Sequence, residues 1–537
     1  MQKFQKWSDT YKRLSKANKD LALAPEELET YALSAYLTGH DAESFQLFEQ
    51  AHQVYLDQKK TEKAIRCAFW LGLILINKGN KARGSGWLAR AERLLSDQQL
   101  SCAEEGLLLI PAALGAFSAG ESDKALNLFS QAFSIGQDFD DNDLIILGQL
   151  GSGQALVQQG NVAKGIKLLD ELMITLETED AFPVLNGIVY CAVIETCRKV
   201  WDLGRAHEWT LALTRWCEEQ PDIVPFRGQG LVRRAEIARF RGAWLQALEE
   251  TNGACELLTR PPGESAAGEA YYLKAELFRL GGKFKQAEEN YHEAAKWGRP
   301  SQPGLALLRL AQGMHEAAEI SIRNTLKENN DLKRRAELLP HVVQIMLAVK
   351  QTEVARKATE ELFDIANKFD APYLYAIVGH SRGCVYLNEG KLQLALEQLQ
   401  KALDIWKHLD TPYESALTQE QIGLVYQKMN DIDNSTVELS TAQWIFEQLN
   451  AIPDLVRINK TLSKNSLNKT HGLSLRELQV LRLVAAGKAN KSVADTLFIS
   501  ERTVDRHVSN IFKKLNVSSR VEATTFAIKH QLTDNLS

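Results

Sequence analysis

Small and apolar residues recur along most of the chain at positions that suit pairs of helices rather than strands. In one unit, Gly120 is followed by Ala125 five residues later and by Ala132 seven residues after that. Positions seven apart share one face of a helix, so the two alanines lie on the same side of the helix after the glycine. Other units with this pattern begin at Gly242, Gly282 and Gly390. The pattern predicts hairpins of two antiparallel helices with the small residue in the turn.

The turn positions repeat about every 40 residues. They fall at residues 39, 79, 120, 160, about 201, 242, 282, 313, about 350, 390 and about 430. A period of this length is typical of helical-repeat proteins, in which the apolar face of each hairpin is buried only by its neighbours. We therefore predict an all-α solenoid of about 10–11 helical hairpins.

The repeat over residues 28–462 resembles the tetratricopeptide (TPR) repeat in a long form. It departs from the usual period of about 34 residues, and the units near 201 and 350 have no glycine in the turn. Residues 1–27 show helical spacing ahead of the second helix and are expected to form an N-terminal capping helix. The resemblance implies a surface for a peptide, a protein or a small-molecule effector, with no code that names it.

One step of the repeat, between the turns at 282 and 313, is shorter than the others. It holds residues 298–304, where two prolines and two glycines must interrupt the helices. We expect an irregularity of the superhelix at this place. The segment is either a tight connection or a site for a ligand or partner.

Composition and motifs exclude several classes of protein. Hydrophobic residues make up 45% and charged residues 24% of the chain, as in folded globular proteins. We find no stretch of 18 apolar residues, no metal-ligand spacing and no phosphate-binding loop. Ser381 stands in a G-x-S-x-G sequence, but the segment lies in a repeat helix and lacks the strand that a nucleophile elbow needs. We expect a cytoplasmic protein that is not an enzyme and uses no cofactor.

The pattern changes after residues 463–470, a polar segment that we interpret as a linker. Ser474 begins a capping box for one helix, and Gly487 ends that helix. A second short helix is expected over residues 490–497, and Ser500 is a good N-cap for a third. A fourth helix follows from about residue 520. Four short helices with a tight turn between the second and third predict a helix-turn-helix domain over residues 471–537.

Charge distinguishes this C-terminal region from the rest. The whole chain has 63 Lys and Arg against 68 Asp and Glu, a net charge of −5 that argues against a nucleic-acid partner. Residues 471–537 alone carry ten basic and six acidic residues, a net +4, so the remainder is at −9. The positive surplus therefore lies on the domain whose shape suits DNA. The candidate DNA-binding residues are Asn490, Lys491, Arg502, Thr503, Asp505, Arg506, Ser509, Lys513 and Lys514.

The motifs of this region resemble the LuxR-type DNA-binding domain. They include Gly487-Lys488-Ala489-Asn490-Lys491, Thr503-Val504, Asn510-Ile511 and Arg520-Val521-Glu522-Ala523. The resemblance implies that Asp505, Arg506 and Ser509 face bases. It also implies that Asn490, Lys491, Thr503 and Lys513 approach phosphates or the groove edge. Many members have Lys where Asp505 stands, and a carboxylate there can accept from cytosine N4 and change the sequence preference.

The whole layout resembles LuxR-family regulators that carry helical repeats ahead of the DNA-binding domain. It implies a bacterial transcriptional regulator that binds double-stranded promoter DNA as a homodimer and works with RNA polymerase. The family dimerises partly through the fourth helix, where the candidates are Val521, Thr524, Phe526 and Ile528. The alternative is a non-catalytic TPR interaction scaffold whose C-terminal helical domain docks protein. The sequence leaves open the effector, the target genes and the sign of regulation.

Overall fold

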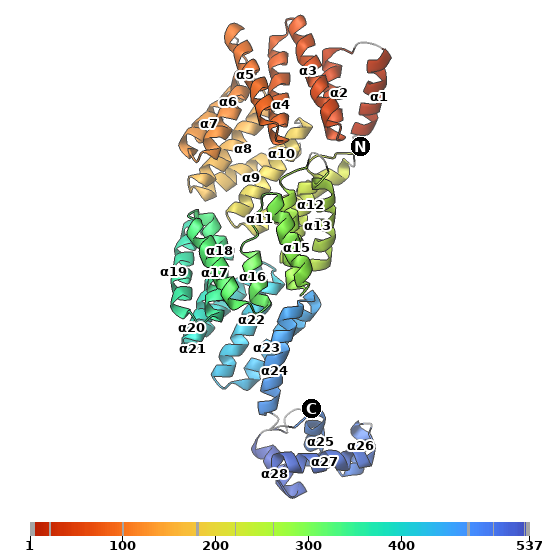
Figure 1. The fold of residues 1–537 in the computed structure, drawn as a ribbon, viewed down its shortest axis with the longest axis vertical. Helices are drawn as coiled ribbons and strands as arrows, with labels where there is room; N and C mark the ends of the chain where they lie inside the picture. The colour runs from red at the N-terminus through yellow and green to blue at the C-terminus, as the bar shows by residue number, and fades with distance from the viewer. Residues whose placement is uncertain are drawn as a thin grey trace.

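The all-α architecture is confirmed by a computed structural model of the 537-residue chain (Figure 1). The structure describes residues 6–20, 23–98, 101–178, 182–220, 222–260, 263–469, 473–497, 499–530 and 532. Those residues form 28 helices, and no strand occurs among them. Within the same residues, no helix has both the length and the apolar character needed to cross a membrane.

Twenty-two helices of the described chain pair into eleven consecutive hairpins, as the repeat predicts. The first six are α2 and α3 (Pro25–Leu37, Asp41–Asp57), α4 and α5 (Thr61–Asn77, Lys81–Gln98), α6 and α7 (Ala103–Ser118, Ser122–Asp138), α8 and α9 (Asn142–Gln158, Val162–Thr178), α10 and α11 (Pro183–Lys199, Leu203–Glu219), and α12 and α13 (Arg227–Phe240, Trp244–Leu258). The last five are α14 and α15 (Ala267–Leu280, Phe284–Lys296), α16 and α17 (Gly304–Ala311, His315–Glu328), α18 and α19 (Leu332–Ala348, Thr352–Phe369), α20 and α21 (Pro372–Asn388, Leu392–His408), and α22 and α23 (Pro412–Lys428, Ile432–Leu449).

Single helices flank the hairpins. The first, α1 (Trp7–Asp20), buries Leu14 against the core of the first hairpins, as expected of a capping helix. The last, α24 (Ile452–Lys469), buries Ile458 against α23 and continues toward the C-terminal helices. Residues 463–469, assigned to a linker in the sequence, therefore lie in a helix. The segment holds neither Pro nor Gly, so nothing in it stops the helix that precedes it.

The turn inside each hairpin passes through a left-handed residue. Eight of the eleven turns use glycine with φ between 77° and 92°, as at Gly79 and Gly390. The other three place Trp201, Lys350 and Asn430 in the same region, with φ of 62° to 63°. The turn geometry is therefore kept in the three units that have no glycine in the turn, two of which, near 201 and 350, are apparent in the repeat pattern. An L side chain costs about 1–2 kcal/mol in this conformation, which glycine avoids.

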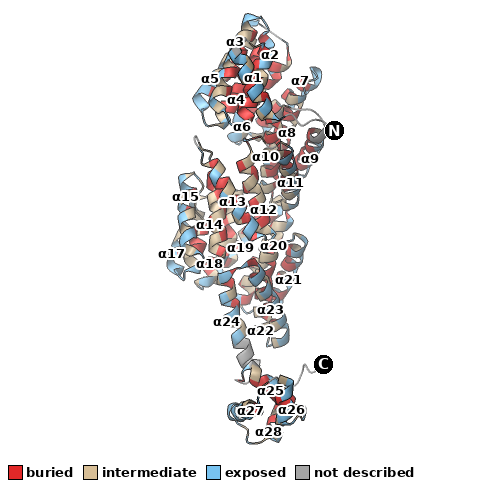
Figure 2. Cartoon of the chain, turned by 90° about the vertical axis from the view of Figure 1, so that its right-hand side faces the viewer, coloured by how far each residue is buried: buried red, intermediate tan, exposed pale blue. Residues whose placement is uncertain are grey.

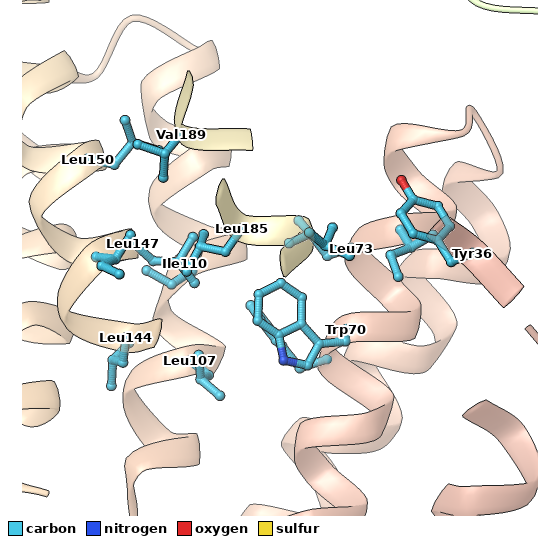
Figure 3. Packing of buried hydrophobic residues seen from close by; sticks show 14 of the residues in the cluster. Tyr36, Trp70, Leu73, Leu107, Ile110, Leu144, Leu147, Leu150, Leu185 and Val189 are labelled. Atoms are coloured by element: carbon cyan, nitrogen blue, oxygen red, sulfur yellow. The ribbon is translucent and has the colours of Figure 1, made fainter. Parts of the chain in front are cut away.

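The core is shared between hairpins, not enclosed within one. Leu107 and Ile110 of α6 pack with Leu144 and Leu147 of α8, and Leu185 of α10 continues the same layer (Figure 3). Buried residues follow the inner faces of the stacked helices while exposed residues cover their outer faces (Figure 2). Each hairpin thus depends on its neighbours for burial of its apolar face.

The segment 298–304 forms a tight connection before α16, the shortest helix of the solenoid with eight described residues. The Ser301 hydroxyl donates to the carbonyl of Tyr291 at 3.0 Å. The Gly304 amide donates to the Tyr272 hydroxyl at 3.1 Å. The predicted irregularity is confirmed, and these contacts favour the tight connection over a ligand site.

Residues far apart in sequence meet where successive turns of the superhelix touch. At the first such place, the amide of Val224 donates to the carbonyl of Leu37 at 2.8 Å. At the second, Trp201 stacks on Tyr373, with ring centroids 5.4 Å apart and planes at 6°. There the Arg241 guanidinium also lies 3.4 Å from the Asp410 carboxylate. We call this second place, formed by α10–α13 against α20–α23, the seam. The repeat pattern does not predict it.

Candidate nucleic-acid interface

Four short helices form the C-terminal domain at the far end of α24 (Figures 1 and 2). They are α25 (Leu475–Ala485), α26 (Asn490–Leu497), α27 (Glu501–Leu515) and α28 (Arg520–Lys529). Their starts are the ones that the sequence predicts. The Ser474 hydroxyl accepts from the Glu477 amide at 3.2 Å while the Glu477 carboxylate accepts from the Ser474 amide at 2.7 Å. At the start of α27 the Ser500 hydroxyl accepts from the Thr503 amide at 3.1 Å. At the start of α28 the Ser519 hydroxyl accepts from the Glu522 amide at 3.2 Å.

A single apolar cluster holds these helices together. Val504, Ile511 and Leu515 of α27 are buried, and Val508 is half-buried, so one stripe of α27 faces inward. The stripe packs on apolar residues of α25, α26 and α28, among them Leu481. Burial of this stripe fixes the rotation of α27 about its axis and turns its polar side outward.

The outward side of α27 carries most of the predicted DNA-contacting residues. Arg502, Asp505, Arg506, Ser509 and Lys513 are all exposed there. Asp505 and Arg506 are adjacent, and each other member lies three or four residues from the nearest one, so all five occupy one side of the helix. The structure therefore brings these five side chains together on one surface.

The sixth candidate on α27, Thr503, is only half-exposed. Its hydroxyl lies 2.7 Å from the hydroxyl of Ser500, within the N-cap of the helix. Its remaining freedom to reach a phosphate is therefore smaller than that of the exposed residues.

A network between helices involves the candidates Asn490 and Asp505. The Asn490 amide donates to the Asp505 carboxylate at 2.6 Å, and the Arg520 guanidinium donates to the Asn490 amide oxygen at 2.7 Å. Arg520 also donates to the carbonyl of Lys488. The network joins the start of α26 to α27 and α28, and it holds the Asp505 carboxylate in place on the exposed side of α27. Sequence reasoning missed Arg520 as a member, because its two partners, Asn490 and Lys488, are 30 and 32 residues away in the chain.

Lys514 lies apart from the other candidates. Its ammonium group is 2.6 Å from the carboxylate of Glu477, whose side chain is only 5% exposed against 42% for the lysine. Burial raises the pKa of Glu477, but hydrogen bonds from Lys514 and Ser474 outweigh burial and hold that pKa below its usual value. Lys514 thus binds α27 to α25, whereas Lys513 and Lys491 are exposed and make no ion pair or hydrogen bond with the described residues of the domain.

The predicted dimer residues of α28 do not share one face. Val521 and Ile528 are 75% and 62% exposed and lie seven residues apart, on one side of the helix. Thr524 is half-buried, and Phe526 packs against the apolar cluster, with its ring centroid 4.2 Å from that of His530 and the two rings tilted by 34°. Only Val521 and Ile528 therefore offer apolar surface to a second chain.

Ser381, the serine of the G-x-S-x-G sequence, lies in the solenoid and not in the C-terminal domain. Ser381 is 3% exposed and sits within the continuous helix α20, so the strand-turn-helix shape of an elbow is missing there. Among the described residues, no group of three or more His, Cys, Asp or Glu could hold a metal ion.

Known proteins match the C-terminal domain. Residues 471–527 match the family described as "Bacterial regulatory proteins, luxR family". Over 110 residues, the chain is 36% identical to the uncharacterized transcriptional regulatory protein YhcZ of Bacillus subtilis. The matched segment is 20% of this chain and 48% of YhcZ. The chain is 44% identical over 62 residues to the transcriptional regulatory protein LiaR of the same organism, 12% of this chain and 29% of LiaR. The chain thus spans less than half of the length of these relatives.

The solenoid has a looser similarity to solved structures. The protein chain described in "Crystal structure of APC/C hetero-tetramer Cut9-Hcn1" superposes with a TM-score of 0.34 and 14% identity, over 86% of this chain and 95% of that one. A TM-score this low does not establish a shared fold. The solenoid is instead defined by the eleven hairpins of the chain itself. Residues 471–527 form a LuxR-type DNA-binding domain, and a TPR-like helical solenoid precedes it.

Proposed function

We propose that the chain is a bacterial transcriptional regulator whose α27 binds promoter DNA in the major groove. The observation that carries the proposal is the division of α27 into a buried apolar stripe and an exposed polar face. On that face, Arg506 can fork onto guanine, and Ser509 can contact several bases. The net +4 of residues 471–537 adds attraction to the phosphate backbone.

The proposed contacts divide into two groups. Arg506, Ser509 and Asp505 are assigned to base edges, because they occupy the middle of the exposed face. The residues assigned to phosphates or the groove edge are Asn490, Lys491, Arg502, Thr503, Lys513 and Lys514. Within this group Lys514 is the weakest candidate, since a phosphate would have to compete with Glu477 for its ammonium group.

A dimer on DNA belongs to the same proposal. One domain of this kind offers few base contacts, and two half-sites would multiply them. Val521 and Ile528 are the apolar residues of α28 that remain exposed for a second copy. The solenoid would receive a peptide, protein or small-molecule effector, and RNA polymerase would be the further partner at the promoter. Because bacterial DNA lies in the cytoplasm, the protein would act there, and no catalytic step is assigned to it.

The direct experiment is selection of genomic DNA fragments by the full chain. We expect a recurring sequence to be enriched at low salt. The affinity for that sequence should fall steeply with salt, because each phosphate contact releases counterions. Affinity is then measured by fluorescence anisotropy on the enriched sequence and on a shuffled one.

The matched control is Lys407→Ala, which removes an exposed lysine from α21 of the solenoid and should leave DNA affinity unchanged. Failure to enrich any sequence with the full chain and with residues 463–537 would contradict the proposal. That result would favour the scaffold alternative, in which the C-terminal domain docks protein.

A further inference from the structure

A cavity of about 160 Å³ opens on the seam. Its walls are the fifth and sixth hairpins on one side and the connection between α21 and α22 on the other. A cavity of about 150 Å³ is large enough for a ring the size of benzene. Any molecule bound in this cavity therefore touches two turns of the superhelix at once.

The floor of the cavity is apolar. Ile194 of α10, Leu203 of α11, and Ile237 and Phe240 of α12 line it. Ile194 is fully buried and the other three are half-buried, which leaves apolar surface facing the cavity. An apolar body placed on this floor removes that surface from water.

Two of the three arginines that line the cavity are already neutralised. Arg198 and Arg233 both pair with Glu195 and Glu236, at nitrogen–oxygen distances of 2.5 to 3.1 Å. The four groups form a closed network in which each guanidinium meets both carboxylates. They have little remaining charge to offer to a ligand.

The third arginine, Arg241, is the cation with spare donors. Its ion pair with Asp410 is 3.4 Å long, and the two side chains are 47% and 69% exposed. Exposed pairs of this kind contribute little, so Arg241 can turn to a ligand at small cost. A guanidinium has five N–H donors and favours carboxylates that accept two of them.

His207 lies at the same rim. Its Nδ1 is buried and has no hydrogen-bond partner. His207, Arg241 and Asp410 all line the cavity. Because the Nδ1 atom has almost no accessible surface, the imidazole serves as part of the cavity wall, and Arg241 supplies the hydrogen bonds.

We propose that this cavity binds a small organic carboxylate with an apolar body about the size of one ring. The carboxylate accepts hydrogen bonds from the Arg241 guanidinium, and the body lies on Ile237 and Phe240. The assignment deepens the effector role proposed for the solenoid, and only its regulatory consequence rests on that role.

The test uses the full chain without DNA and 4-fluorobenzoate as the probe, followed by ¹⁹F line broadening. A ligand of about ten heavy atoms in such a site should bind with a Kd near 1 mM. The uncharged isostere 4-fluorobenzamide is expected to bind at least tenfold more weakly. Absence of broadening with 4-fluorobenzoate, or equal binding of both probes, overturns the proposal.

Three variants locate the site. Arg241→Met should weaken 4-fluorobenzoate at least tenfold, and Gly204→Leu, which fills the mouth of the cavity, should weaken both probes. Gly204 tolerates the change, because an added Cβ meets only Asp202 at 3.6 Å. The control Arg215→Met removes an exposed arginine of α11 outside the cavity and should leave binding unchanged. Binding that survives both Arg241→Met and Gly204→Leu overturns the proposal.

The same samples separate this proposal from the proposed function. Probe binding is measured without DNA, so it is unaffected if the C-terminal domain binds no sequence. Slower amide exchange in residues 408–411 with 4-fluorobenzoate supports a ligand that bridges the seam. Unchanged exchange there, in a chain that binds the probe, overturns the bridging geometry. A change in DNA affinity with the probe then reports on regulation alone.

Discussion

Arg506 and Lys513 occupy the same exposed face of α27 but suit different parts of DNA. Arg506 lies near the middle of the helix, where a side chain reaches base edges when the helix enters the major groove. Lys513 lies in the last turn and carries a compact charge that any phosphate can satisfy. Under the proposed function, Arg506 would therefore serve recognition of sequence and Lys513 attraction to the backbone.

The expected outcome is a difference in kind between the two alanine variants. Arg506→Ala should lose about 1–3 kcal/mol on the selected sequence and little on shuffled DNA. Lys513→Ala should weaken both DNAs alike and reduce the salt dependence by about one phosphate contact. Anisotropy titrations at two salt concentrations check both. Equal losses for the two variants on both DNAs would refute the assignment of roles.

Glu477 illustrates how one residue can serve two elements. Its carboxylate completes the capping box of α25 and also binds Lys514 of α27, and its pKa is lowered by these bonds despite burial. A carboxyl group whose pKa is lower in the folded state stabilises the fold above its unfolded pKa, near 4.5. That stabilisation is lost as the pH falls through the lower, folded pKa.

We therefore expect the C-terminal domain to lose stability on acidification, from below about pH 4.5. Residues 473–532 have an apolar cluster of their own, so residues 463–537 can be melted alone and followed by circular dichroism. Glu477→Gln should reduce the difference in Tm between pH 3.5 and pH 7, since Gln keeps the cap but does not ionise. Lys514→Met should cost about 1–2 kcal/mol at pH 7, because it leaves a buried carboxylate without its cation. A Glu477→Gln domain with the same pH dependence as the parent would show that another group is responsible.

At the scale of elements, the turn inside a hairpin is the unit that repeats. The turns at Trp201 and Lys350, two of the three without glycine, keep the left-handed conformation because the helices on both sides fix where the chain must reverse. Neighbouring hairpins impose that reversal through their shared core. Tertiary packing thus overrides the local preference of Trp and Lys, at an energy cost that glycine would not incur.

Lys350→Gly should therefore stabilise the ninth hairpin by about 1 kcal/mol, because Lys350 is exposed and loses no contact. The reciprocal change, Gly390→Ala, should destabilise the tenth hairpin by about 1 kcal/mol. An added Cβ at Gly390 meets nothing within 4 Å, so backbone strain alone acts there. Amide hydrogen exchange in α18–α21 measures both changes locally. Slower exchange in Gly390→Ala, or faster exchange in Lys350→Gly, would contradict the strain argument.

At the scale of the whole molecule, the seam decides how the solenoid is held. Gly242 lies in the turn of the sixth hairpin and faces Pro412 and Leu449 of the eleventh, where an added Cβ would come within 2.8 Å and 2.7 Å of their side chains. Residues 170 or more apart in sequence therefore hold one another in place. The apolar cluster that joins Ala247 to Phe446 extends the same contact.

Gly242→Ala should loosen the seam, and Gly79→Ala is its matched control. Both glycines have positive φ, 79° and 83°, so both variants carry similar backbone strain. Only at Gly242 does the new methyl group press on another turn of the superhelix, since Gly79 has nothing within 4 Å. Small-angle scattering should show a larger radius of gyration for Gly242→Ala and an unchanged one for Gly79→Ala. Equal radii for the two variants would mean that the seam does not limit the extension of the solenoid.

Periodicity in the sequence was sufficient for the elements and for much of the site. The turn positions, the bounds of α26 at Asn490–Leu497 and the caps at Ser474, Ser500 and Ser519 are all readable from local chemistry. These features depend on residues within one helical turn of each other, and the sequence places such residues side by side. The orientation of α27 follows too, because its apolar stripe has helical spacing.

Tertiary structure alone decided the contacts between residues distant in sequence. Lys514 turns to Glu477, Asn490 joins Asp505 to Arg520, and Arg241 meets Asp410 across the seam. The periodicity of the sequence does not place any of these residues next to its partner. In the solenoid, the angle between successive hairpins accumulates, so small rotations determine which turns meet. The sequence by itself determined an all-α repeat solenoid with a helix-turn-helix domain, and the packing of whole elements determined which charged groups stay free to bind.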